Sequence, residues 1–98
     1  MAELSTLARP YAKAAFEFAV GAGELSSWSD QLSVAAAVSQ VEKIDKILSS
    51  PGLTSEQQAK QFIDVCGDEL TDGVKNFVNV LAENKRIPLL PEIVEVFE

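Results

Sequence analysis

The sequence of 98 residues contains no histidine and a single cysteine. Without histidine, the side chain that most often acts as a general base or a metal ligand near neutral pH is missing, and no Ser-His arrangement can activate a nucleophile. Cys66 has no second cysteine with which to form an internal disulfide, so we expect it to be a small buried apolar residue. These absences argue against an enzyme, and we expect no catalytic, cofactor-binding or metal-binding residue.

Long apolar runs and basic residues are also scarce. No run approaches the roughly 18 apolar residues of a membrane-spanning helix. Eight Lys and Arg stand against fifteen Asp and Glu, which gives a net charge of −7. Nucleic-acid binding without sequence preference depends on Lys and Arg at the phosphates, and docking on anionic lipid depends on the same side chains. The composition therefore predicts no nucleic-acid partner and no direct insertion into a membrane.

The N-terminal sequence MAELSTLARP does not read as a targeting segment. It lacks the basic start and the apolar block of a signal peptide, and its acidic Glu3 argues against an organelle transit peptide. We expect a soluble protein of the cytoplasm or of a comparable compartment.

What the sequence does contain is a helical pattern. The apolar fraction of 47% is ordinary for a globular protein. Apolar residues recur with a period near 3.6 residues, and no stretch shows a clean period of two. Ninety-eight residues suffice for one domain with a modest core. The sequence thus predicts an all-α fold, a single helical domain over residues 1–98 built as a compact bundle of about six helices.

The boundaries of the first two helices are predicted from their flanking residues. The first helix should run from about residue 5 or 6 to residue 20, where Gly21 and Gly23 end it. The second should run over residues 28–40, with Ser27 as the residue whose side chain caps the first turn.

Similar signals mark the ends of the later helices. A short third helix is expected over residues 42–48. Thr54 and Gln57 have the spacing of a capping box, in which each side chain accepts from the backbone N–H of the other residue, and Gly67 should end the helix that they begin. The sixth helix should open with Pro91, because proline suits the first helical position.

A surface helix of a small bundle needs one apolar stripe a little over 100° wide. The helix near the N-terminus has more apolar surface than that. On a helical wheel, charged side chains form one narrow stripe of Arg9, Lys13 and Glu17. Small side chains form an apolar stripe of Ala8, Ala12, Ala15 and Ala19. A second apolar stripe beside it consists of Leu7, Tyr11, Ala14 and Phe18.

The fifth helix, expected from residue 72 or 73 to residue 84, shows a milder excess of apolar surface. Val80 lies well off the core stripe of this helix, beside Asn76 and Asn84. Two interpretations remain open. In one, the first helix is simply central and enclosed by neighbours on all sides. In the other, the first helix and the fifth line a groove for another amphipathic helix.

The segment TLARPYAKAAFEFA, residues 6–19, resembles the N-terminal signature of the delta subunit of F-type ATP synthase, whose mitochondrial relative is the oligomycin-sensitivity-conferring subunit. The resemblance continues through WSDQL, FIDVCGDEL (62–70) and NFVNVLAENKRIPLLPEI (76–93), and so covers almost the whole chain. A delta subunit is normally close to twice this length. The chain therefore resembles the N-terminal domain alone.

The resemblance implies a non-catalytic six-helix bundle at the top of the F1 head. Such a domain belongs to the peripheral stalk, or stator, which keeps the catalytic hexamer from turning with the rotor. The resemblance and the lack of a transit peptide together imply a peripheral position on the cytoplasmic side of a bacterial inner membrane, within the F1Fo complex. The b subunits of the stalk would be met only by the family's C-terminal region, which we expect this chain to lack.

The resemblance also implies a partner, the amphipathic N-terminal helix of an alpha subunit, bound in a groove between the first and fifth helices. Carried over by position, the groove involves Tyr11, Ala14, Asn76 and Val80. Wheel geometry adds Leu7, Phe18 and Glu83. A competing hypothesis is an all-α signalling adaptor that binds an amphipathic helix, but it does not account for the sequence blocks quoted above.

Overall fold

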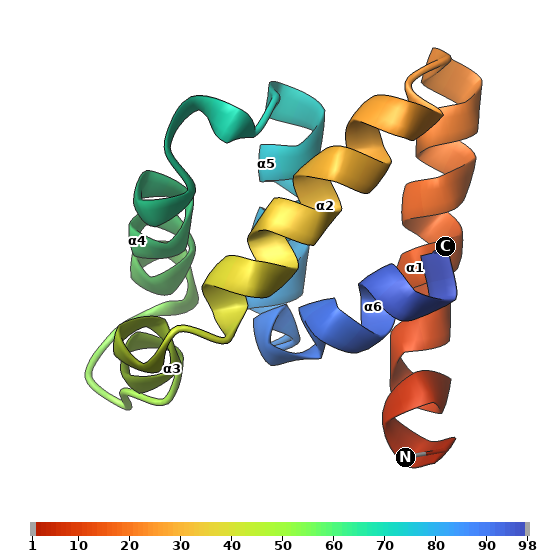
Figure 1. The fold of residues 1–98 in the computed structure, drawn as a ribbon. Coiled ribbons are helices and arrows are strands. Elements are labelled where there is room, and N and C mark those ends of the chain that lie inside the picture. Colours follow the sequence, from red (N-terminus) through yellow and green to blue (C-terminus); the bar gives the residue numbers. More distant parts are fainter. Residues whose placement is uncertain (1, 98) are drawn as a thin grey trace.

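The structure is a computed structural model that describes residues 2–97, with side chains described for residues 5–97, and its regular elements are helices (Figure 1). They follow one another in the order α1 (Ala2–Ala22), α2 (Leu25–Ser39), α3 (Glu42–Leu48), α4 (Ser55–Cys66), the 3-10 segment η1 (Gly67–Glu69), α5 (Asp72–Glu83), the 3-10 segment η2 (Ile87–Leu89) and α6 (Leu90–Phe97). The described residues contain no strand. The prediction of an all-α bundle of about six helices is confirmed.

Helix α1 extends beyond both of its predicted ends, and the prediction that Gly21 ends it was wrong. The helix continues through Gly21 to Ala22, and Gly23 ends it with a φ of +69°, a conformation that glycine adopts without steric cost. The N–H of Glu24 then donates to the carbonyl of Ala19 at 2.8 Å. This bond closes a Schellman motif, the hydrogen-bonded turn that commonly ends helices at a glycine.

Helix α2 begins at Leu25 rather than at residue 28, so the prediction that Ser27 caps it was wrong. Because the glycine turn returns the chain directly into a new helix, Glu24 occupies the capping position, and it makes no side-chain capping bond. The Ser27 hydroxyl, now inside the helix, instead accepts a hydrogen bond from Gln31 Nε2 at 2.8 Å.

The later boundaries agree closely with the sequence. Helix α3 has the predicted bounds. The Thr54 hydroxyl accepts from the N–H of Gln57 at 3.1 Å, and Gln57 Oε1 accepts from the N–H of Thr54 at 2.9 Å, so the capping box is confirmed. Gly67 ends α4 with a φ of +68°. Helix α5 ends at Glu83, one residue before its predicted end. The prediction that Pro91 opens the sixth helix was wrong, because η2 leads directly into α6 at Leu90 and the proline takes the second helical position.

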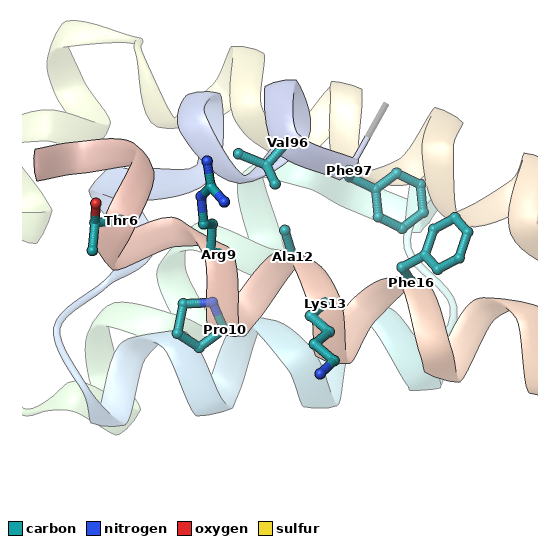
Figure 2. Close-up of a pocket in the computed structure, with 8 residues that line it drawn as sticks. All are labelled: Thr6, Arg9, Pro10, Ala12, Lys13, Phe16, Val96 and Phe97. Carbon is teal, nitrogen blue, oxygen red and sulfur yellow. The ribbon is translucent and has the colours of Figure 1, made fainter. Parts of the chain in front are cut away.

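Helix α1 packs along α6 at one side of the molecule, α3 and α4 lie at the other side, and α2 crosses between them (Figure 1). At the end of the α1/α6 contact the rings of Phe16 and Phe97 meet edge to face, with centroids 5.8 Å apart (Figure 2). Helix α5 packs against α4, whereas α1 and α5 are not among the closely packed helix pairs. This separation leaves room for a groove between α1 and α5.

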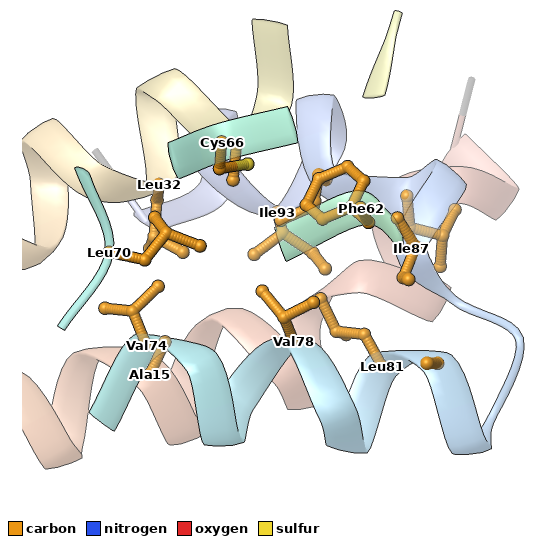
Figure 3. Packing of buried hydrophobic residues seen from close by; sticks show 14 of the residues in the cluster. Ala15, Leu32, Phe62, Cys66, Leu70, Val74, Val78, Leu81, Ile87 and Ile93 are labelled. Atoms are coloured by element: carbon orange, nitrogen blue, oxygen red, sulfur yellow. The ribbon is translucent and has the colours of Figure 1, made fainter. Parts of the chain in front are cut away.

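The core consists of large side chains from α2 to α6 and small ones from α1 (Figure 3). The largest fully buried side chains are Trp28, Leu32, Ile44, Phe62, Val74, Val78, Leu81, Ile87, Leu90 and Ile93. The contribution of α1 is the predicted alanine stripe, Ala8, Ala12, Ala15 and Ala19. Because these side chains end at a methyl group, α6 can lie close to α1.

Helix α1 is not enclosed on all sides, so the interpretation of it as a central helix is wrong. The side chains of Leu7, Phe16 and Phe18 are 42%, 43% and 57% exposed. Among the α1 side chains of residues 5–22, only the alanine stripe is fully buried, and apolar side chains remain on both flanks of the helix.

Candidate partner-binding site

A depression between α1 and α5 collects apolar side chains that these helices do not bury in the core. Its volume is about 250 Å³. The residues that line it are Tyr11, Ala14, Ala15 and Phe18 of α1, Trp28 of α2, and Gly73, Asn76, Phe77 and Val80 of α5. None of these described residues is charged, and their polar side-chain groups are the Tyr11 hydroxyl, the Asn76 amide and the Trp28 indole N–H. We call this depression the α1/α5 groove.

Trp28 forms the floor of the α1/α5 groove. Its ring lies 5.2 Å from the ring of Phe18 on α1 and 5.8 Å from the ring of Phe77 on α5, measured between centroids. The Trp28 side chain is only 2% exposed, whereas Phe18 is largely exposed. A row of three aromatic rings therefore runs from one wall to the other, and the α2 ring between α1 and α5 keeps the two walls apart.

Gly73 leaves space at the end of the groove where these rings meet. A Cβ atom at this position would lie 3.4 Å from Phe18 Cε1 and 3.4 Å from Trp28 Cζ2. Any larger side chain would rest on both rings and fill this end of the groove. With glycine, the aromatic floor remains open to a partner.

Trp28 also carries an unmet hydrogen-bond donor. Among the described residues, its Nε1 is the buried side-chain polar atom that has no hydrogen-bond partner. Buried polar groups in folded proteins usually have one. Trp28 therefore lines the α1/α5 groove while its own N–H is buried without a partner.

The structure brings five of the seven residues predicted from the sequence to the groove, namely Tyr11, Ala14, Phe18, Asn76 and Val80. The other two, Leu7 and Glu83, are exposed but do not line it. Each lies about one turn beyond the lining residues of its own helix.

Four of the lining residues were not predicted as site residues, namely Ala15, Trp28, Gly73 and Phe77. Ala15, Trp28 and Phe77 pack in or against the core, but each also lines the groove. The spacing that marked them as apolar held no sign of this second contact. No signal in the sequence distinguishes Gly73 from an ordinary residue of the first helical turn.

The rest of the described chain offers little reactive chemistry. Cys66 is buried in the core, as predicted, and burial raises the pKa of its thiol from 9.0 to about 11. The thiol therefore stays protonated near neutral pH, whereas the thiolate is the nucleophile. Among the side chains that the structure describes, no group of three or more acidic, cysteine or histidine residues could hold a metal ion. None of the helices over residues 2–97 has the length and apolar character needed to cross a bilayer.

Comparison with known proteins places the chain in a family. Residues 7–98 match the family described as ATP synthase delta (OSCP) subunit. The chain is 56% identical to the ATP synthase subunit delta of Teredinibacter turnerae over 98 residues, which is 100% of this chain and 55% of that protein. It is 54% identical to the subunit delta of Cellvibrio japonicus over 97 residues, 99% of this chain and 54% of that protein.

The subunit delta of Hahella chejuensis is 55% identical over 98 residues, again 100% of this chain and 55% of that protein. The chain thus spans about half the length of the curated relatives that it matches. The matched region includes all the sequence blocks that a signalling adaptor would leave unexplained. The chain therefore belongs to the ATP synthase delta (OSCP) subunit family.

Proposed function

We propose that residues 1–98 form a single stator domain of an F-type ATP synthase. As part of a delta subunit in the peripheral stalk, the domain binds the amphipathic N-terminal helix of an alpha subunit and helps to hold the catalytic head against the torque of the rotor. It takes part in no catalysis itself. Membership of the delta family supports its place in the complex, and the α1/α5 groove supports the binding step.

The observation that carries the binding step is the regular spacing of the residues that line both walls of the groove. Tyr11, Ala14 and Phe18 follow one another at intervals of three and four residues on α1, and Asn76 and Val80 lie four residues apart on α5. Residues at these intervals share one face of a helix. Each wall is therefore a continuous helix face, which suits a partner helix that lays an apolar stripe between them.

On this proposal the domain works at the cytoplasmic side of a bacterial inner membrane, as a peripheral part of the F1Fo complex. Its own contact is with alpha, and the b subunits are met by the part of a delta subunit that lies outside the matched half of the relatives. The net charge of −7 supports a role in which the chain binds neither nucleic acid nor anionic lipid.

Calorimetric titration with a synthetic peptide of the alpha N-terminal helix tests the proposal. Val80 is 46% exposed and lines the groove, whereas Val65 is 50% exposed on α4 and lies outside it. Val80→Ala should weaken binding about tenfold, because the residues whose truncation costs more than about 1 kcal/mol cluster near the centre of an interface. Val65→Ala should leave the affinity unchanged, and both variants should melt like the unmodified chain.

Two results would remove the α1/α5 groove as the binding site. One is an equal loss of affinity in the two valine variants. The other is the absence of measurable binding between the peptide and the unmodified chain.

A further inference from the structure

A second groove lies on the opposite flank of α1, between α1 and α6 (Figure 2). Its volume is about 680 Å³, compared with about 250 Å³ for the α1/α5 groove. Its apolar part is formed by Phe16 of α1 and by Val96 and Phe97 of α6. We call it the α1/α6 groove.

The two grooves use different faces of α1. At about 100° per residue, Arg9 and Phe16 lie roughly a quarter turn to one side of the buried alanine stripe. Tyr11, Ala14 and Phe18 lie about as far to the other side. No residue lines both grooves. A partner bound in one groove therefore leaves the other open.

The apolar part of the α1/α6 groove is exposed although both of its helices are packed together. Phe16 is 43% exposed and Val96 is 41% exposed, while Phe97 is buried beneath them. The edge-to-face contact between Phe16 and Phe97 fixes the Phe16 ring at the surface. This gives the groove a firm aromatic wall against which a second apolar stripe can pack.

Two basic side chains border this apolar surface. Arg9 and Lys13 are exposed, lie four residues apart on α1 and stand on the wall of the groove. Neither makes an ion pair with a described residue, since the salt bridge found over this range joins Lys46 to Glu42. No acidic side chain among the described residues lines the groove. In a chain of net charge −7, this is a local excess of positive charge beside apolar area.

We propose that the α1/α6 groove is a second docking surface and that its occupant is an amphipathic helix with an acidic edge. The apolar face of that helix covers Phe16 and Val96. Carboxylates four residues apart on its edge meet Arg9 and Lys13, which are themselves spaced as neighbours on a helix face. The proposal goes beyond the function proposed above and does not depend on it, because the alpha helix is assigned to the other flank of α1.

A helix fits these observations better than other anionic partners. Nucleic acids and anionic membranes bind mainly through many basic contacts, and the groove offers two in a strongly acidic chain. An amphipathic helix supplies both the apolar stripe and the matching carboxylates.

Fluorescence anisotropy with a pair of labelled synthetic helices tests the proposal. One peptide carries leucines at i, i+3, i+4 and i+7 with glutamates along the edge of this stripe, and its twin carries lysine at every glutamate position. The unmodified chain should bind the glutamate peptide at least about tenfold more tightly than the lysine twin, because complementary charge sets such preferences. Added salt should weaken the binding of the glutamate peptide.

Charge-reversed variants locate the binding. The double substitution Arg9→Glu and Lys13→Glu should weaken the glutamate peptide about tenfold or more and should reverse the preference toward the lysine twin. The matched control is Lys43→Glu with Lys60→Glu, which changes the net charge equally at exposed positions outside the groove. The control should keep the original preference, and so should Val80→Ala in the α1/α5 groove.

Several results would overturn the proposal. They are equal affinity of the unmodified chain for the two peptides, equal losses in the two double variants, or a loss of binding in Val80→Ala. Tighter binding to phosphatidylglycerol vesicles than to the glutamate peptide would assign the groove to a membrane surface and would also overturn the proposal.

If the Arg9 and Lys13 variant melts at a lower temperature than the unmodified chain, Val96→Glu tests the same groove. It places a carboxylate on the α6 wall, and unchanged binding of the glutamate peptide would then contradict the proposal.

Discussion

At the scale of single residues, Trp28 joins the core to the candidate binding site. Its side chain is almost fully buried, yet its ring touches Phe18 on α1 and Phe77 on α5 and forms the floor of the α1/α5 groove. A largely buried side chain of α2 thus contributes to a surface groove between two other helices.

Two alanines of α1 should respond in opposite ways to the same substitution. Ala14 is exposed and lines the α1/α5 groove, whereas Ala19 is fully buried in the core. Ala14→Leu should melt like the unmodified chain, because leucine is a good helix former, and should block the alpha peptide by filling the groove. Ala19→Leu should lower the free energy of unfolding by about 1–3 kcal/mol through overpacking.

Thermal melts beside peptide titrations of both variants check this pair. A sharply lowered melting temperature for Ala14→Leu, with normal binding by the folded protein, would place Ala14 in the core instead. The stripe that continues through Tyr11 and Phe18 would then no longer belong to the binding face.

At the scale of secondary-structure elements, the turn between α1 and α2 makes a second matched pair of predictions. Gly23 has a φ of +69°, whereas Gly21 is helical, and a Cβ atom added at Gly21 would meet no neighbouring side chain or packed element within 4 Å. Gly23→Ala should lower the free energy of unfolding by about 1–2 kcal/mol, the cost of the left-handed conformation for other residues. Gly21→Ala should raise it by about 0.5–1 kcal/mol, because glycine weakens a helix interior.

Urea unfolding curves measure both changes. Shifts of the same sign in the two variants would mean that α1 does not end at Gly23.

Element boundaries were predictable from the sequence wherever one local signal acted alone. The capping box of Thr54 and Gln57 needs only residues three apart, and the structure forms both of its hydrogen bonds. The start of α2 was not predictable in this way. Ser27 is a suitable capping residue, but the turn at Gly23 needs only one residue before the next helix, so α2 has already begun when the chain reaches Ser27.

The candidate site was predictable only in part, because it depends on three helices at once. The wheel revealed the apolar excess of α1, and the resemblance to the delta subunit supplied a partner and four groove residues. Trp28, Phe77 and Gly73 line the groove because α2 places the Trp28 ring between α1 and α5. Spacing within one helix carries no information about that placement.

At the scale of the whole molecule, an acidic chain carries two apolar grooves of different electrostatic character on the flanks of α1. None of the described residues that line the α1/α5 groove is charged, while Arg9 and Lys13 border the α1/α6 groove. The affinity for the alpha peptide should therefore fall only modestly when salt shortens the Debye length from about 10 Å at 0.1 M to about 3 Å at 1 M.

Calorimetric titrations of the alpha peptide at these two ionic strengths measure the effect. A steep loss of affinity with salt would instead show that the charged surface of the chain, rather than the α1/α5 groove, drives association with alpha.

An NMR experiment can test directly whether the α1/α5 groove receives the N-terminal helix of an alpha subunit, as we propose. The most direct measurement is an NMR titration of the isotope-labelled chain with the alpha peptide, followed through the backbone amide shifts. If the alpha helix binds in the groove, the largest changes should fall at residues that line it, namely Tyr11, Ala14, Phe18, Gly73, Asn76 and Val80. Arg9, Lys13 and Val96 on the other flank should change little. The largest changes on the α1/α6 flank, or on α4, would show that the alpha helix binds elsewhere.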